Sequence, residues 1–441
     1  MRIASNIIET IKAKADIVEV IGEYVHLTKK GQNFIGLCPF HNDSTPSLTV
    51  SSAKGIYKCF ACDASGDVIK FLQEYLNISF VEAVKMLAKK YGVEIPEDSY
   101  SSIGDEDQRK RESMFIINDY ASKFYAENLF ADTDEARKAL YYATNRWPQD
   151  FIRTFGIGYA SNSWDSFSLW ANGKGLDKDL MLELGLVKEK STNDDVYDTF
   201  RGRIMIPIRD KQHRIIAFTA RLLPDILAHD PNAPKYINSS TSLIYDKGNS
   251  LFGIDVAWNA ASKAGVMNLV EGAPDVMRLQ VIGASNTVAP LGSSWTEAQL
   301  SMLKRITDRL NIIPDSDIPK EGEHFGVGFT SAMRTGKLAL SLGFIVTIQE
   351  IPIGDWKNDP DSYLVSKDKL DELTRQDFVM WYASKVINLN GENIPQQAKA
   401  IHEVAELVKT IPDKVLQESY TDKLINVYGH ENMWKREIMG V

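Results

Sequence analysis

Cysteine is scarce in this chain and is confined to one short stretch. Among 441 residues the only cysteines are Cys38, Cys59 and Cys62, which lie within a span of 25 positions. An odd number of clustered cysteines is unlike a disulfide framework, and such a cluster is more typical of metal binding. A chain of this length also buries enough apolar surface to fold without cross-links.

Long apolar runs and a nucleotide-hydrolysing motor are missing as well. No apolar run approaches the roughly 20 residues that span a bilayer. The N-terminal segment MRIASNIIETIKAKADIVEV carries acidic and polar residues, which indicates an amphipathic helix rather than a signal peptide. No GxxxxGKS or GxxxxGKT loop occurs, so we expect no helicase motor in this sequence. We therefore expect a cytoplasmic protein without a membrane partner.

Positive charge is in deficit overall, but not everywhere. The net charge of −9 argues at first against a nucleic-acid partner. Between Phe200 and Ser250, however, eight Lys and Arg residues stand against four Asp and Glu residues. A local field governs contact with phosphates, so an acidic chain can still hold a phosphate-binding strip. Composition alone therefore leaves the partner open.

The cysteines form a pattern together with one histidine. Two residues separate Cys38 from His41, seventeen separate His41 from Cys59, and two separate Cys59 from Cys62. Four ligands spaced in this way are typical of a tetrahedral zinc ribbon. Because protein would fill all four positions, the zinc is expected to be structural rather than catalytic. The alternative, three buried free cysteines beside a chance histidine, does not explain why every cysteine stands at a ligand position.

Hydrophobic periodicity predicts a multidomain α/β fold. In the N-terminal part, short strands are expected at 33–37, 47–50 and 56–59 and helices at 67–75 and 80–91. Further on, strands at 266–270, 287–290, 311–314 and 344–348 alternate with helices at 274–282, 296–307 and 329–342, which predicts a largely parallel sheet. The predicted domains are a zinc-binding domain (1–96), a polar linker (97–112), a mixed basic subdomain (113–262), a parallel α/β subdomain (263–366) and a C-terminal helical subdomain (367–441).

Carboxylates follow three of the expected parallel strands. These residues are Glu271, Asp275, Asp315, Asp317, Asp359 and Asp361. Sites in open α/β sheets gather at the carboxyl ends of the strands, and oxygen ligands there favour Mg²⁺ or Mn²⁺. Each acidic pair alone is common in solvated loops, so the prediction depends on all three occurring together.

Basic residues concentrate on one predicted strand and beyond it. Arg201 and Arg203 are two apart, so their side chains should share one face of the strand. Ile204, Ile206 and Ile208 would form the opposite, buried face. Arg221, Lys235, Tyr236, Asn238 and Lys247 follow. From periodicity alone, arginines on a half-buried strand are better explained as facing water.

Several of these segments resemble one family. The run GQNFIGLCPFHNDSTPSLTVSSAKGIYKCFACDASGDVIKFL resembles the zinc-binding domain of bacterial DnaG-type DNA primases. The order of the acidic residues resembles the Toprim fold. The stretches FRGRIMIPIRDKQHRIIAFTARLL and PKYINSS resemble the N-terminal part of the primase polymerase domain. The resemblance covers most of the chain.

The resemblance implies a primase, a DNA-directed RNA polymerase and nucleotidyltransferase that makes short RNA primers from NTPs on single-stranded DNA template during replication. It implies a monomer, with a replicative helicase and single-strand-binding protein as candidate partners. The zinc module would bind template through Lys29, Lys30, Phe34, Tyr57, Lys58 and Phe60, since aromatic and basic groups suit unpaired bases. Each aromatic residue on such strands could equally be core.

The family resemblance also assigns roles to individual residues. Glu271, Asp275, Asp315, Asp317, Asp359 and Asp361 would form the catalytic site, in which Glu271, Asp315, Asp317 and Asp359 would hold Mg²⁺ or Mn²⁺. The residues expected to face nucleotide, template and primer are Arg146, Arg201, Arg203, Arg221, Lys235, Tyr236, Asn238 and Lys247. Arg146 is assigned from its place before Trp147, where the family has an Arg-Gly pair.

The chain departs from the family pattern near the acidic residues. Ala273 and Pro274 replace a bulky pair, Ser316 replaces a glycine, and an extra loop, IPKEGEHFGV, follows Asp317. These departures suggest a divergent or phage-like member. They keep two alternatives open: a Toprim nuclease, or a DNA-binding replication accessory without activity.

The tail is expected to be too short for one family domain. Only 77 residues follow Leu364, and their helical pattern resembles the end of the polymerase domain. We therefore expect the helicase-binding domain to be absent, and we expect primer synthesis to gain little from a DnaB-type helicase.

Overall fold

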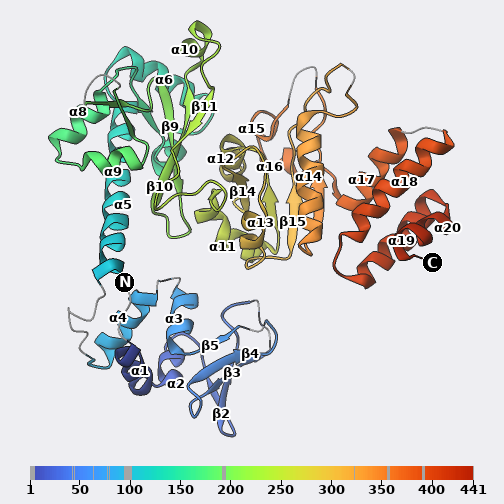
Figure 1. Ribbon diagram of the computed structural model, residues 1–441, viewed down its shortest axis with the longest axis horizontal. Helices are drawn as coiled ribbons and strands as arrows, with labels where there is room; N and C mark the ends of the chain where they lie inside the picture. Colours follow the sequence, from blue (N-terminus) through green and yellow to red (C-terminus); the bar gives the residue numbers. More distant parts are fainter. Residues whose placement is uncertain are drawn as a thin grey trace. The chain divides into compact units, whose positions relative to one another are not determined.

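The computed structural model (Figure 1) describes residues 5–41, 43, 45–62, 64–76, 78, 80–93, 102–190, 195–321, 323–354, 358–389 and 393–440. The chain divides into two compact units, Met1–Ser113 and Met114–Val441. Within these described ranges, no helix combines the length and apolar character needed to span a membrane.

The N-terminal unit is a small antiparallel sheet with helices. Its strands are β1 (Thr28–Lys30), β2 (Asn33–Gly36), β3 (Leu48–Ser51), β4 (Ile56–Cys59) and β5 (Ser65–Gly66), paired in sequence order. Its helices are α1 (Ser5–Lys14), α2 (Ile17–Gly22), α3 (Val68–Leu76) and α4 (Phe80–Lys90). The amphipathic α3 buries Phe71 and Leu72 against Leu48, Val50 and Tyr57 of the sheet. The strands and helices expected in this region are confirmed.

A long helix, α5 (Ser102–Leu129), begins inside the expected linker. Residues 97–101 of that linker lie outside the described residues, and the rest of it is helical. The helices and strands that follow are α6 (Asp134–Thr144), α7 (Gln149–Phe155), β6 (Gly158–Ala160), α8 (Ser166–Gly173), α9 (Lys178–Glu183), β7 (Val187–Glu189) and β8 (Val196–Asp198). Strands β7 and β8 form a separate hairpin.

The basic segment forms a four-stranded antiparallel sheet in the order β11-β10-β9-β6. Its other members are β9 (Arg203–Arg209), β10 (Ile215–Leu222) and β11 (Tyr236–Asn238), with α10 (Pro224–His229) between β10 and β11. Both faces of β9 are covered. Ile204, Ile206 and Ile208 join one core, which we call the shared core, and Met205 joins another with α5 and α8.

The placement of Arg201 corrects one expectation. Strand β9 begins at Arg203, and Gly202 before it has a φ of +61°. A left-handed residue at this point breaks the two-residue alternation of the strand. Arg201 therefore lies outside the strand, and it does not share a face with Arg203. Because Met205 is also buried, the strand has no solvent-facing side.

The third part is a six-stranded sheet in the order β12-β14-β13-β15-β16-β17. Its strands are β12 (Leu251–Phe252), β13 (Met267–Leu269), β14 (Thr287–Pro290), β15 (Arg309–Ile312), β16 (Ile345–Gln349) and β17 (Arg375–Asp377). The connecting helices are α11 (Ile254–Ala264), α12 (Ala273–Val281), α13 (Glu297–Leu303) and α14 (Val327–Ser341). The four central strands are parallel, as expected, and both edge strands are antiparallel.

The shared core joins the two sheets of this unit. Val276 and Leu279 of α12 belong to the same buried cluster as Ile206 and Ile208 of β9. The division that we expected between residues 262 and 263 therefore runs across one continuous hydrophobic core.

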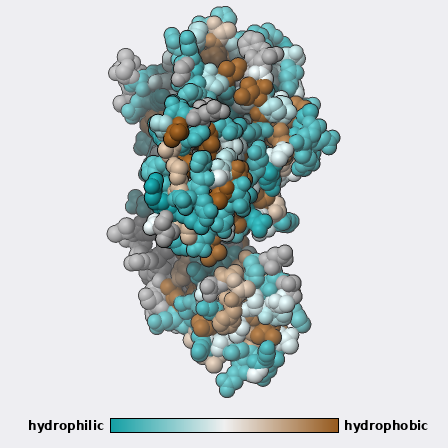
Figure 2. Space-filling model, turned by 90° about the vertical axis from the view of Figure 1, so that its right-hand side faces the viewer, coloured by the Kyte–Doolittle hydropathy of each residue, from teal (hydrophilic) through white to brown (hydrophobic). Residues whose placement is uncertain are grey.

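The C-terminal helices pack on the parallel sheet. They are α15 (Pro360–Tyr363), α16 (Lys367–Asp371), α17 (Phe378–Leu389), α18 (Ile394–Lys409), α19 (Lys414–Tyr428) and α20 (Glu431–Trp434), followed by a π-helical turn, Lys435–Met439. Trp381, Val404 and Leu424 join one core with Val346 and Ile348 of β16. Seen from the right-hand side of Figure 1, the surface is mostly hydrophilic, with hydrophobic residues scattered in small groups (Figure 2).

Candidate metal and nucleic-acid sites

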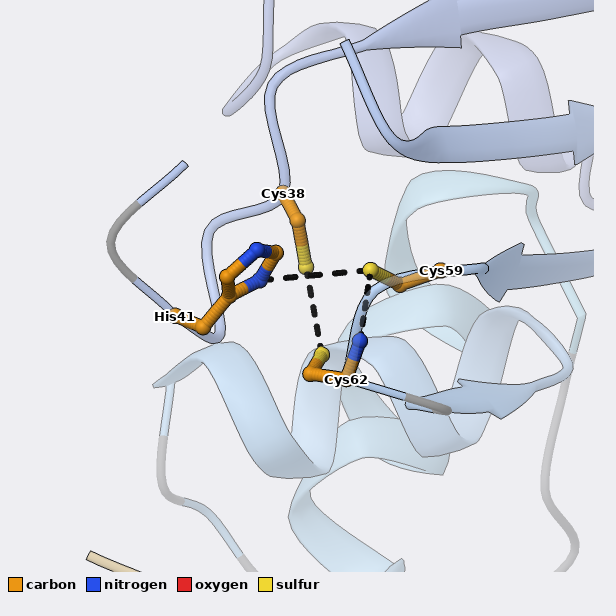
Figure 3. Close-up of side chains that lie close together, drawn as sticks. All are labelled: Cys38, His41, Cys59 and Cys62. Carbon is orange, nitrogen blue, oxygen red and sulfur yellow. Dashed lines mark hydrogen bonds between the residues drawn. The ribbon is translucent and has the colours of Figure 1, made fainter. Parts of the chain in front are cut away.

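The three cysteines and His41 come together at the ends of strands in the N-terminal unit. Cys38 follows β2, Cys59 ends β4, and the four side chains point toward one another (Figure 3). All four ligand atoms lie within 4.8 Å of one another, with Cys38 Sγ 3.8 Å from Cys62 Sγ. In a tetrahedral zinc site with Zn–S bonds of about 2.3 Å, sulfur atoms lie roughly 3.8 Å apart. The expected ligand set therefore fits zinc.

Polar groups around the ligands hold them in place. Asp43 accepts the backbone N–H of Cys38 at 2.7 Å and lies 3.8 Å from Nε2 of His41. Burial raises the pKa of the Cys59 thiol, but the Ser47 hydroxyl and the backbone N–H groups of Cys62 and Ala61 outweigh it and bring that pKa to about 7. Such partners orient metal ligands and favour the thiolate that binds the metal. Sequence reasoning missed Asp43 because its contacts with Cys38 and His41 depend on the conformation of the loop.

The aromatic residues of the ribbon divide into core and surface. Tyr57 is fully buried and donates its hydroxyl to Glu74, so it belongs to the core rather than to a base-stacking surface. Phe34 is half-buried against the same core. Phe60, by contrast, is 72% exposed, and Nζ of Lys58 lies 5.7 Å from its ring. Lys29 and Lys30 are also exposed.

The expected acidic residues follow β13, β15 and β16. Glu271, Asp315, Asp317 and Asp359 are half-buried, and we call these four the acidic cluster. Asp275 lies behind them: it is buried, and its carboxylate accepts the N–H of Gly272 at 3.0 Å and of Asp361 at 3.1 Å. Burial raises the pKa of Asp275 well above its usual range, and the charges of Asp315, Asp359 and Glu271 raise it further.

Two backbone hydrogen bonds align the second and third acidic loops. Ser316 donates to the carbonyl of Asn358 at 2.7 Å, and Asn358 donates back at 3.1 Å. This bridge places Asp317 and Asp359 on neighbouring loops. Asp359 also caps α15 by accepting the N–H of Ser362 at 2.8 Å. Residues 355–357 of the third loop lie outside the described residues.

The extra loop returns to the acidic cluster through a glycine. Asp317 accepts the N–H of Gly328, in the first turn of α14, at 3.0 Å. A Cβ on Gly328 would lie 2.3 Å from the carbonyl oxygen of Asp315, so no larger residue fits there without moving the acidic loop. The structure thus keeps Asp315 and Asp317 in place despite the inserted residues.

Asp361 and Arg146 occupy different places from those expected. Asp361 is buried and forms an ion pair with Arg146, and one of its oxygens lies 3.4 Å from Nε of Arg278. Arg278 also donates to the backbone carbonyl of Arg146 at 2.7 Å. In this network two arginines offset the charge of Asp361, although its Oδ1 has no hydrogen-bond partner among the described residues. The network leaves neither Asp361 in the acidic cluster nor Arg146 on an open nucleic-acid surface.

The other basic residues also differ in exposure. Arg203 is buried, and burial lowers its pKa to about 10. Asn238 donates to the carbonyl of Leu291 at 2.9 Å, and Arg221 donates to the hydroxyl of Tyr236 at 2.6 Å. Lys235 is exposed, and the backbone carbonyl of Lys247 accepts a hydrogen bond from Gln299.

Arg201 lies beside two neighbouring aromatic rings that sequence reasoning missed. Its guanidinium is 4.1 Å from the ring centre of Trp164 and 5.4 Å from that of Tyr197. Trp164 is 62% exposed. We call these three residues the Trp164 stack. A large exposed aromatic ring beside a cation suits contact with an unpaired base. Nothing in the sequence pattern pairs these positions, because each lies on a different element.

A zinc ribbon joined to a basic antiparallel sheet and a parallel sheet edged with carboxylates defines a class of nucleic-acid enzyme. Comparison with family models agrees with this class. Residues 3–102 match the CHC2 zinc finger, residues 124–258 match the N-terminal domain of the DNA primase catalytic core, and residues 377–429 match the DnaB-helicase binding domain of primase.

Similar proteins and solved structures are DNA primases. The chain is 36% identical over 421 residues to the DNA primase of Halalkalibacterium halodurans, covering 93% of this chain and 67% of that one. It is 33% identical over 431 residues to that of Clostridium acetobutylicum, covering 96% and 68%. The zinc-binding and RNA polymerase domains of Aquifex aeolicus primase match with a TM-score of 0.60 and 29% identity, over 99% of both chains.

The chain belongs to the bacterial DnaG-type DNA primase family. It is accordingly a DNA-directed RNA polymerase, a nucleotidyltransferase that makes RNA primers on DNA. The expected fold class, function and enzyme class are confirmed.

The expectation that a helicase-binding domain is absent was wrong. The match to that domain covers residues 377–429, which include all of α17, α18 and α19. Our interpretation had assigned these helices to the polymerase domain and required more chain for a separate bundle. The helices instead pack on the parallel sheet through Trp381 and Val404, so a short segment suffices.

Proposed function

We propose that the acidic cluster holds Mg²⁺ or Mn²⁺ for ribonucleotide addition by this primase. The bridge between Ser316 and Asn358 carries the proposal, because it brings two carboxylate-bearing loops to one edge of the sheet. Half-buried carboxylates at the ends of parallel strands are the oxygen ligands that these cations prefer. Bound there, divalent cations would activate the primer hydroxyl and neutralise the leaving pyrophosphate.

Asp275 has a different role in this proposal. Its two oxygens accept the N–H groups of Gly272 and Asp361, so it joins the loop after β13 to α15. We infer that Asp275 positions Glu271 and Asp359, and that it does not itself bind the cation. Labelled NTPs supplied with a single-stranded template test the proposal, with Mg²⁺ or Mn²⁺ and in EDTA. New oligoribonucleotides that form only with the cation support it, and equal synthesis in EDTA would contradict it.

Unpaired template is expected to contact the exposed groups on each unit. On the zinc ribbon these are Lys58 and Phe60, and on the basic sheet they are the Trp164 stack. The RNA polymerase domain of Mycobacterium tuberculosis primase, 26% identical to this chain with a TM-score of 0.59, has been solved with double-stranded DNA, which supports a DNA-binding role for the corresponding unit here.

Arg201→Ala should weaken single-strand binding and reduce its salt dependence. Each lost phosphate contact lowers the slope of log affinity against log salt by about one. Fluorescence anisotropy of a labelled single strand at several salt concentrations measures that slope. Arg137→Ala is the matched control, because Arg137 is an exposed arginine on α6 that already pairs with Asp132 and Asp134. Equal slopes for Arg201→Ala and the natural protein would assign Arg201 to a structural stack with Trp164.

We further propose that α17 to α19 dock on a replicative helicase of the DnaB type. This helical segment carries exposed apolar residues, with Ile394 77%, Val415 71% and Val427 57% exposed. The family match over residues 377–429 carries this proposal, and these exposed side chains are apolar groups that docking on a partner could bury.

Val427→Asp should weaken the helicase complex by about tenfold, since a buried carboxylate at an apolar contact costs more than 1.4 kcal/mol. Analytical gel filtration and a binding titration with a DnaB-type helicase measure the effect. Val365→Asp is the control, because Val365 is 63% exposed but lies outside the matched segment. Failure of the natural chain to bind any such helicase would contradict the proposal.

A further inference from the structure

A cavity lies in the C-terminal unit, away from the acidic cluster. It has a volume of about 270 Å³ and lies between the turn that joins β9 to β10 and the helices α11 and α13. This volume is close to the lower end of the range of about 300–1,000 Å³ that is common for small-ligand sites. None of the residues in the acidic cluster lines this cavity.

Cations surround the mouth of the cavity. Arg209, Lys211 and Arg305 line it together with one acid, Asp210, which Arg214 engages at 2.7 Å. Lys211 and Arg305 are exposed, and neither forms an ion pair with any residue that the structure describes. Two unneutralised cations at one opening are suited to a phosphate or another anion.

The interior of the cavity is apolar and has one aromatic wall. Ile254 is buried at its base, whereas Trp258 and Met302 pack against the core and remain half-buried. Nζ of Lys211 lies 5.4 Å from the ring centre of Trp258. A flat heterocycle can stack on an indole, and a cation beside that indole can meet the attached phosphate. The combination matches a nucleotide better than a simple anion, because inorganic phosphate would leave the apolar wall uncovered.

The cavity is continuous with a segment that carries a predicted nucleic-acid contact. Lys247 begins this segment, and Asn249 and Ser250 at its other end line the cavity. Helix α13 holds the segment in place: Gln299 donates to the carbonyls of Lys247 at 2.9 Å and Ser250 at 2.8 Å. The segment is therefore a fixed connection rather than a loose loop.

We propose that this cavity, the Trp258 pocket, binds a nucleotide unit through a base on Trp258 and a phosphate between Lys211 and Arg305. The inference rests on the proposed function in one respect, namely that the enzyme meets nucleotides both free and within a strand. The shared chemistry is a heterocycle joined to a phosphate. The pocket is a second site, distinct from the place of nucleotide addition.

Binding measured without divalent cations tests the pocket separately from the acidic cluster. The probes are N-methylanthraniloyl-ATP and a short fluorescein-labelled deoxyribonucleotide strand, each titrated into the full chain in EDTA. Arg305→Glu should lower the binding affinity for at least one probe by about tenfold, as expected for loss of a charge-assisted phosphate contact. Arg309→Glu is the matched control: Arg309 is an exposed arginine four positions further along that does not line the pocket.

The two probes distinguish the sources of the nucleotide. If only binding of the ATP analogue is weakened, the pocket is assigned to free nucleotides. If only binding of the strand is weakened, it is assigned to template. If binding of both probes is weakened, the pocket takes nucleotides from both sources. Trp258→Leu should weaken binding of the same probe as Arg305→Glu, with the circular-dichroism spectrum and the midpoint of thermal unfolding as the check that the variant folds. The proposal is overturned if neither probe responds, if Arg309→Glu has an equal effect, or if Arg305 matters and Trp258 does not.

Discussion

Primer synthesis should fall by at least about a hundredfold in Asp315→Asn, because an amide keeps the shape of the side chain but removes the charge that holds a cation. Asp315 lies three residues after the end of β15, and its charge acts on Asp275 together with the charges of Glu271 and Asp359. Incorporation of labelled NTPs on a single-stranded template measures the loss. Binding of the strand itself should stay unchanged, because the strand contacts proposed above lie elsewhere.

The strand that carries Asp315 also offers the control. Asp308 is an exposed carboxylate at the amino end of β15, so Asp308→Asn makes the same chemical change at the opposite end of the same strand. It should leave synthesis unaffected. Synthesis by Asp315→Asn at a near-natural rate would show that the acidic cluster is not the cation site.

Cys59→Ser should abolish zinc binding. Structural zinc contributes about 10–16 kcal/mol in small zinc modules, and Cys59 supplies a ligand at the end of β4. Metal analysis of the purified variant should find no stoichiometric zinc. Initiation on bare template should be lost, whereas extension of a primer already annealed to template should continue, because the C-terminal unit has its own cores.

A conservative change on the neighbouring strand serves as the control for Cys59→Ser. Thr49→Ser changes a half-buried position on β3 that is no zinc ligand, and it should keep both zinc and initiation. A zinc-free Cys59→Ser protein that still starts primers normally would separate the metal from template reading. Absence of zinc from the natural protein prepared without chelator would contradict the zinc assignment itself.

The zinc site and the parallel sheet could be predicted because their signals are local. Four ligands at fixed spacing identify the ribbon, and Cys38 and Cys59 lie where that spacing requires. Alternation of strands and helices predicted a largely parallel sheet, and β14, β13, β15 and β16 are parallel. The edge strands β12 and β17, of two and three residues, were missed because such short runs carry no periodicity.

Contacts between distant residues could not be predicted in the same way. Arg146 and Asp361 are 215 positions apart, and nothing near either residue in sequence shows that they form a pair. The Trp164 stack likewise joins a loop, strand β8 and Arg201, which lies two residues before β9. The assumption of a solvent-facing strand was wrong for Arg203 because the sheet is covered on both sides.

The shared core makes the basic sheet and the parallel sheet a single cooperative unit. Since Ile206 of β9 and Val276 of α12 belong to one buried cluster, neither sheet can melt while the other keeps its core intact. Heat should therefore abolish substrate contacts and the catalytic carboxylate arrangement in the same transition. A destabilising substitution in β9 should likewise lower the stability of the acidic loops, although no residue of that strand needs to contact the reacting atoms.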